Sequence, residues 1–194
     1  MIIQVVKGIP DVLRAESAQL YWEAFGGKLG HVLGPDALAL KFLDRTIQSD
    51  HAFVALDGKG ALLGVAGFKS PEGAFVGGGL DDLRLVYGRF GCLWRSLVLS
   101  LLEQDIENQR FLMDGICVGR AARSQGVGTA LLAALFDEAR ARNYQSVRLD
   151  VIDSNWRAKA LYERQGFIPI RTAKLGLLRY IFGFAASTTM VRPL

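Results

Sequence analysis

The sequence predicts a layered α/β fold, because segments with strand patterns and helix patterns alternate through its second half. Residues 111–118 and 146–152 are apolar runs of strand length, and residues 126–142 and 155–165 place apolar side chains at helical spacing. This alternation is typical of a sheet covered by helices. Two closing strands are expected at residues 167–171 and 188–192.

The N-terminal part is expected to form one strand followed by two helices. Residues 2–6 (IIQVV) have the composition of a short strand, and residues 11–25 have apolar side chains at helical spacing. Gly26 and Gly27 follow, and we expect them to end this helix because glycine is a poor helix former. A second helix is expected after Pro35.

A hairpin and a loop are expected next. Residues 51–56 and 61–68 are apolar runs joined by Asp-Gly-Lys-Gly at 57–60, which is the composition of a hairpin turn. Residues 70–80 contain Pro71 and four glycines, so a loop is predicted there.

Residues 83–102 form an apolar segment that is about as long as the ~20 residues a spanning helix requires. It contains Arg84, Arg89 and Arg95, each of which is costly at bilayer depth. We therefore expect a buried or interface helix and no transmembrane segment. A helix lying on a membrane surface is the alternative.

Length and composition favour one self-sufficient domain over residues 1–194. The chain is 51% hydrophobic, enough to bury a core, and no linker-like stretch interrupts it. Two cysteines are too few for a disulfide framework, and the N-terminus lacks the pattern of a secretion signal, so a cytoplasmic location is expected. Only two histidines are present, which argues against His-rich zinc catalysis, and no metal is expected.

The charge balance favours an anionic ligand. Lys and Arg number 23 against 19 Asp and Glu, which gives a net charge of +4 and a pI near 9.2. Nucleic acid and a phosphate-bearing cofactor are the two anionic ligands considered. The chain has no dense Lys/Arg tract, so it carries no specific signal for nucleic-acid binding.

A glycine-containing loop connects the strand ending at Val118 to the helix that begins near Gly126. Unpaired backbone N–H groups converge there with the positive end of the helix dipole, which makes an anion site. Gly126 and Gly128 would let the main chain approach a pyrophosphate, and Arg123 can add charged contacts. An ordinary tight turn is the alternative. The loop lacks the Gly-Lys-Ser/Thr of a P-loop and the third glycine of a dinucleotide fold.

Two blocks occur in a characteristic order and separation. Arg-Ser-Gln-Gly-Val-Gly at 123–128 is followed by Asn155, by Ala-Leu-Tyr at 160–162 and by Gly-Phe at 166–167. In these blocks, across about residues 110–170, the sequence resembles the GCN5-related N-acetyltransferase (GNAT) superfamily. The resemblance implies a mixed, predominantly antiparallel sheet with a central splayed pair of parallel strands and helices on both faces.

The resemblance also implies a reaction. Such a protein transfers an acetyl group from acetyl-CoA, its co-substrate, to a primary amine by direct attack in a ternary complex. A non-catalytic acyl-CoA sensor or partner-binding module with the same fold is the alternative. The residues that would bind the cofactor are Ile116, Cys117, Val118, Arg123, Ser124, Gln125, Gly126, Val127, Gly128, Thr129, Asn155 and Tyr162.

Three residues are candidates for catalysis. By resemblance, Tyr162 protonates the departing thiolate, although it could instead pack against the sheet. Asp150 and Asp114 are candidates for the general base, and a structural ion pair is the alternative for each. Cys117 is interpreted as a small core residue and not as a nucleophile, and Asn155 as a helix cap.

The acceptor is a small-molecule or peptide amine that the sequence does not identify. The apolar segment at residues 175–184 can line a pocket, form a homodimer interface or fill the core. The sequence does not distinguish an acetyl donor from a longer acyl donor.

Overall fold

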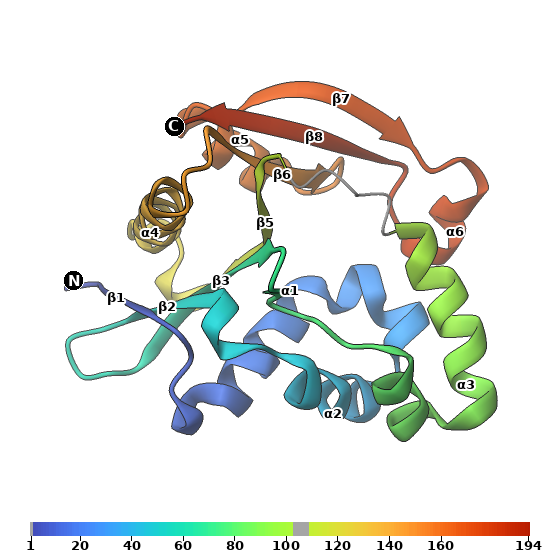
Figure 1. Cartoon of the computed structure of the whole chain (residues 1–194). Helices are drawn as coiled ribbons and strands as arrows, with labels where there is room; N and C mark the ends of the chain where they lie inside the picture. Colours follow the sequence, from blue (N-terminus) through green and yellow to red (C-terminus); the bar gives the residue numbers. More distant parts are fainter. Residues whose placement is uncertain (1, 103–108) are drawn as a thin grey trace.

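The computed structural model describes residues 2–102 and 109–194, and an eight-stranded sheet runs through them (Figure 1). Its strand order is β1-β2-β3-β5-β6-β8-β7, and β4 pairs only with β3. Among these strands β5 and β6 form the one parallel pair, so the predicted mixed, mostly antiparallel sheet is confirmed. The strands are β1 (Gln4–Lys7), β2 (Ala52–Leu56), β3 (Leu62–Ser70), β4 (Gly73–Ala74), β5 (Phe111–Val118), β6 (Ser146–Ile152), β7 (Ile168–Lys174) and β8 (Ala186–Pro193).

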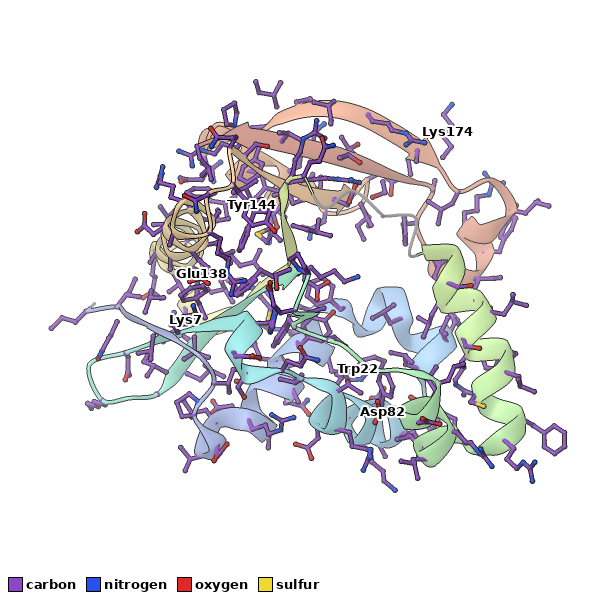
Figure 2. The ribbon with its side chains drawn as sticks, viewed as in Figure 1. Lys7, Trp22, Asp82, Glu138, Tyr144 and Lys174 are labelled. Atoms are coloured by element: carbon purple, nitrogen blue, oxygen red, sulfur yellow. The ribbon has the colours of Figure 1, made fainter. Side chains whose placement is uncertain are left out.

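Helices cover both faces of the sheet, as predicted. On one face α4 and α5 enclose a core cluster that includes Leu131, Leu135 and Phe111. On the other face α1, α2 and α3 enclose a second cluster that includes Trp22, on α1, and Leu43 (Figure 2). The helices are α1 (Arg14–Leu33), α2 (Asp36–Thr46), α3 (Leu80–Leu102), α4 (Val127–Ala141), α5 (Trp156–Arg164) and α6 (Arg179–Phe182).

The parallel strands β5 and β6 pair only where they begin. Phe111 is in register with Val147 and Leu112 with Arg148, and no later residues of the two strands are paired. On its other side β5 stays paired with β3, with an irregularity that leaves Asp114 as the extra residue of a bulge. Residues 113–118 therefore present an edge that β6 does not occupy.

An ion pair fixes the position of α4 against the sheet. Lys7 Nζ on β1 lies 2.7 Å from Glu138 Oε1 on α4, and the two side chains lie beside each other in Figure 2. Glu138 also pairs with Arg142 at 2.7 Å, which holds the C-terminal part of the same helix.

The first helix does not end at Gly26 and Gly27, so that prediction is wrong. Helix α1 continues to Leu33 and stops at Gly34, immediately before Pro35. A Cβ on Gly26 would lie 3.0 Å from Cε2 of Trp22, so this glycine leaves room for a buried ring. Burial of the extended helix offsets the low helix propensity of the glycines.

The predicted helix at residues 83–102 begins earlier and is kinked. Helix α3 starts at Leu80, and Gly88 has φ 73° and ψ 177°, so two helical segments meet there. Leu83 and Cys92 are buried, whereas Phe90 on the opposite side is exposed. Within the described residues, no helix combines the length and apolarity needed to cross a membrane.

Candidate functional site

The N-terminus of α4 presents unpaired backbone donors. Gly126 precedes the helix with φ 87°, and the first helical bond runs from Ala130 N to Gly126 O at 2.9 Å. The N–H groups of Val127, Gly128 and Thr129 have no acceptor among the described residues. Together with the positive end of the helix dipole, these donors suit an anion.

The loop before α4 is held in place by its own hydrogen bonds. Ala122 N donates to Gly119 O at 2.9 Å, and Gln125 Nε2 donates to Ala121 O at 2.7 Å. Arg123 Nε donates to Val118 O at 3.2 Å on the exposed side of the loop. These hydrogen bonds hold the loop in this conformation, and that of Arg123 comes from Nε of its guanidinium.

The two glycines of the loop motif have different roles. Gly126 adopts the left-handed conformation that residues with a Cβ rarely adopt. A Cβ on Gly128 would lie 3.1 Å from Cδ2 of Leu161, so its absence lets α5 pack closely against α4. The sequence analysis assigned both glycines to ligand approach, and the packing role of Gly128 was not expected.

The open edge of β5 lies directly before this loop. Ile116 and Val118 pack against the core on the α4 side, and Cys117 belongs to the core on the α1 side. Their side chains are therefore committed to packing, as the sequence analysis expected. The main chain on the edge that faces β6 is the part available to a ligand.

Tyr162, on α5, is a buried residue of the α4-side core. Its ring contacts Phe167 edge to face, with centroids 5.8 Å apart, so the packing contact considered as the alternative to a catalytic role is present. Burial raises the pKa of its hydroxyl well above the usual range, and the nearby Cys117 thiol adds to the increase. The hydroxyl makes no hydrogen bond to a described residue and stays protonated at neutral pH.

Cys117 is a neutral thiol. It is buried, and its Sγ lies 3.6 Å from the carbonyl oxygen of Val65. Burial raises the pKa of this thiol to about 12. A thiol that stays protonated is a poor nucleophile, which agrees with its interpretation as a core residue.

The two candidate carboxylates have different surroundings. Asp150 Oδ1 accepts a hydrogen bond from Thr189 Oγ1 at 2.5 Å, and Oδ2 lies 3.4 Å from a guanidinium nitrogen of Arg148. The structural ion pair considered for Asp150 is therefore present. Asp114 lies in the bulge of β5, where Oδ2 accepts from Val76 N at 3.4 Å.

Tyr21 joins this region, although the sequence analysis did not single it out. Burial raises the pKa of its hydroxyl well above the usual range, and the neighbouring Asp114 and Cys117 add to the increase. Tyr21 lies on α1, about ninety residues before β5 in the chain, and only the topology brings the two together. No local motif marks it.

Asn155 caps α5, as predicted. Its Oδ1 accepts a hydrogen bond from Ala158 N at 3.3 Å, three residues into the helix. This bond fixes the start of the helix that carries Tyr162.

Comparison with known proteins identifies the family. A model of the acetyltransferase (GNAT) family matches residues 16–167. The chain belongs to the GNAT family. The match confirms the resemblance drawn from the two sequence blocks and extends it toward the N-terminus.

Solved structures with this GNAT fold cover nearly the whole chain. A protein described as histone acetyltransferase HPA2 and related acetyltransferase, from Corynebacterium glutamicum, is 19% identical with a TM-score of 0.69, covering 100% of this chain and 97% of its own. A GCN5-related N-acetyltransferase from Kribbella flavida is 18% identical with a TM-score of 0.65, covering 99% and 98%. A chain of the NatC complex bound to Gag peptide and CoA is 16% identical with a TM-score of 0.59, covering 100% and 99%. No curated protein sequence matches this chain.

The donors found in this GNAT chain fit a CoA thioester. The free N–H groups at the start of α4 suit a diphosphate, and the unpaired edge of β5 suits an amide-bearing arm. Within residues 2–102 and 109–194, no three His, Cys, Asp or Glu side chains gather as a metal site.

Proposed function

We propose that this chain transfers an acetyl group from acetyl-CoA to a primary amine by direct attack in a ternary complex. The observation that carries the proposal is the continuity of the unpaired edge of β5 with the unbonded N–H groups at the start of α4. Membership of the GNAT family and the CoA bound by the NatC complex support it.

The binding step uses backbone groups. Val127, Gly128 and Thr129 donate N–H groups to the diphosphate, and Arg123 adds a positive charge at the same end. The edge of β5 at residues 116–118 pairs with the amide groups of the pantetheine arm. A backbone N–H on this edge polarises the thioester carbonyl.

The chemical step forms a C–N bond and breaks the C–S bond of the thioester. The amine loses a proton to a carboxylate, and Asp114 takes this role because it lies in the bulge where the open edge of β5 begins. Tyr162 donates a proton to the thiolate that leaves. A tyrosine hydroxyl is protonated at neutral pH at its ordinary pKa, and burial raises the pKa of Tyr162 further, so the proton to be donated is present.

The acceptor proposed is a small-molecule or peptide amine. The peptide bound by the NatC complex supports a peptide amine as one class. The location proposed is the cytoplasm, in agreement with the low cysteine content.

A panel of amines tests the proposal. Peptide N-termini, lysine peptides, polyamines, aminoglycosides and small amines are screened for CoA thiol release, with wild type compared with Tyr162→Phe. We expect turnover with one class, and about a hundredfold lower kcat in the variant with little change in acetyl-CoA affinity. Tyr144→Phe is the control, because Tyr144 packs against Phe111 on the same face. Acetyl-CoA binding without turnover on any amine would instead favour the acyl-CoA sensor.

A further inference from the structure

A histidine that directly precedes β2 lies between a carboxylate and a hydroxyl. His51 Nδ1 lies 2.9 Å from Oδ1 of Asp50, and His51 Nε2 lies 3.0 Å from Oγ of Ser70, the last residue of β3. A carboxylate has no proton to donate, so Nδ1 carries the ring proton and Nε2 presents a lone pair to the hydroxyl. This is the order of groups in a Ser-His-Asp triad, which is recognised by geometry and not by position in the sequence.

Packing fixes the imidazole in this orientation. His51 is 4% exposed, and the centre of its ring lies 5.2 Å from that of Phe68. The main chain of Gly73 also lies against the ring, because a Cβ on Gly73 would be 3.0 Å from His51 Cε1. A buried ring with two hydrogen bonds and these packing contacts has little freedom to turn away from Ser70.

The hydroxyl of Ser70, in contrast, can be reached from solvent. Ser70 leads into the turn to β4, and the next two residues, Pro71 and Glu72, are exposed. The hydrogen bond between Ser70 Oγ and Glu72 is exposed as well. The base is therefore buried and the hydroxyl accessible, as nucleophilic catalysis requires.

Glu72 marks a position for a negatively charged oxygen beside this hydroxyl. Its Oε2 lies 2.5 Å from Ser70 Oγ and accepts a hydrogen bond from Arg142 Nη1 at 3.0 Å. Arg142 is held there by Glu138 at 2.7 Å and by the ring of Phe68, whose centre lies 5.2 Å from the guanidinium carbon. The backbone N–H of Glu72 donates to Ser70 Oγ at 3.3 Å. Two hydrogen-bond donors thus lie beside the place where an oxyanion would form.

We propose that Asp50, His51 and Ser70 form a second catalytic site, which hydrolyses small carboxylic esters. Ser70 Oγ attacks the carbonyl carbon of the ester, and His51 Nε2 takes the hydroxyl proton. The C–O bond to the alcohol breaks, and His51 gives this proton to the leaving oxygen. Water, deprotonated by the same nitrogen, then attacks the acyl group on Ser70. The carboxylic acid leaves, and Oγ regains its proton.

Glu72 restrains this site, because the hydroxyl of Ser70 has one proton and two acceptors. When Ser70 donates to Glu72, its proton does not face His51. The Glu72 side chain is 67% exposed, so it can swing into solvent and leave its position beside Arg142 to the substrate oxygen. Removal of this carboxylate should therefore raise the rate of hydrolysis, which loss of a merely structural contact would not do.

Hydrolysis of p-nitrophenyl acetate by the full chain tests the proposal. The assay contains neither CoA nor an amine, so its result does not depend on the proposed acetyl transfer. We expect saturable hydrolysis, at least about a hundredfold lower kcat in Ser70→Ala and in His51→Gln, and about threefold higher kcat in Glu72→Ala. Mass spectrometry of protein treated with a fluorophosphonate should find the label on Ser70.

Asp50 is a positioning residue, and two variants separate this role from a structural one. Asp50→Ala should lower kcat about tenfold with KM unchanged, and Asp50→Glu should restore most of the loss. Ser96→Ala is the matched control, because the Ser96 hydroxyl donates to the carbonyl oxygen of Leu93 within α3 and is exposed. The control should hydrolyse the ester like wild type. Circular dichroism identical to that of wild type shows that each variant folds.

Two results would overturn the proposal. One is hydrolysis of p-nitrophenyl acetate by folded wild type that is no faster than hydrolysis by Ser70→Ala. The other is folded, fluorophosphonate-treated protein that carries no label on Ser70.

Discussion

At the scale of single residues, the two candidate bases are distinguished by where they lie on the sheet. Asp150 is held by Thr189 and by Arg148 on the surface of the sheet, whereas Asp114 lies in the bulge at the start of the open edge of β5. Because the thioester arm is proposed to pair with that open edge, the base is assigned to Asp114. The sequence alone ranked these two residues equally.

Replacing each carboxylate tests this difference. We expect Asp114→Asn to lower kcat about a hundredfold, since it removes the proton acceptor. Asp150→Asn should lower kcat less than about threefold and reduce stability by about 1 kcal/mol through its lost hydrogen bond. Steady-state rates against pH and thermal unfolding measure both effects. The reverse order of rates would assign the base to Asp150.

At the scale of elements, the left-handed residue that precedes α4 sets the geometry of the proposed anion site. Gly126 has φ 87° and directs the free N–H groups of the next three residues to one side. A side chain at this position strains the backbone whatever the space around it.

Gly126→Ala should therefore weaken CoA binding about tenfold and lower the free energy of unfolding by about 1 kcal/mol. Gly60→Ala is the control, because Gly60 has φ 84° in the β2–β3 turn and no atoms crowd its missing Cβ. The control should show a similar loss of stability with CoA affinity unchanged. Calorimetry and denaturant unfolding provide the two measurements. Equal CoA affinity in wild type and Gly126→Ala would show that the loop does not hold the ligand.

The elements that the sequence predicted well are those with a local signal. Apolar periodicity or a capping residue marks the strands at 111–118 and 146–152 and the two helices after them. These signals lie in adjacent residues and can be read without the tertiary structure. Helix α1 was predicted too short, because Gly26 was read as a helix end. Its actual role, leaving room for the Trp22 ring, is visible only in the folded structure. The kink at Gly88 was missed because an isolated glycine is tolerated in a helical pattern.

The candidate site divides in the same way. The loop at 123–129 and the Asn155 cap could be predicted, since a motif of adjacent residues marks each. Tyr21 could not, because α1 and β5 meet only in the tertiary structure. The splay of β5 from β6 came from the family resemblance and not from the pattern of either strand.

At the scale of the whole molecule, buried acidic groups predict how stability depends on pH. Burial raises the pKa of Cys117 from 9.0 to about 12, and that of Tyr21 and Tyr162 well above 10. In the unfolded chain these groups ionise near their ordinary values. The stabilisation is complete below those values and is lost as pH rises, because the unfolded chain releases protons that the folded chain keeps.

We therefore expect the free energy of unfolding to fall steeply above about pH 9. Cys117 alone contributes about 1.4 kcal/mol for each pH unit between the two pKa values. Urea unfolding of wild type and of Cys117→Ala from pH 8 to 11 measures the slope. The free energy of unfolding of Cys117→Ala should fall less steeply with pH, by about 1.4 kcal/mol per pH unit. Identical slopes for wild type and variant would mean that the thiol ionises freely in the folded protein.

The family match covers residues 16–167, and the sheet continues beyond it through β7 and β8. Strand β8 pairs with β6, and β7 pairs with β8, so the C-terminal part shares the sheet that carries the candidate site. We propose that residues 1–194 act as one domain. Cooperative unfolding with a single transition is the expected behaviour.

Isothermal titration with CoA and with pantetheine tests most directly whether the amides at the start of α4 hold a diphosphate. We predict saturable binding of one CoA per chain, and at least about tenfold weaker binding of pantetheine, which has the same amide arm without the diphosphate. Folded protein that gives no saturable heat with CoA, or that binds pantetheine as tightly as CoA, would contradict this account.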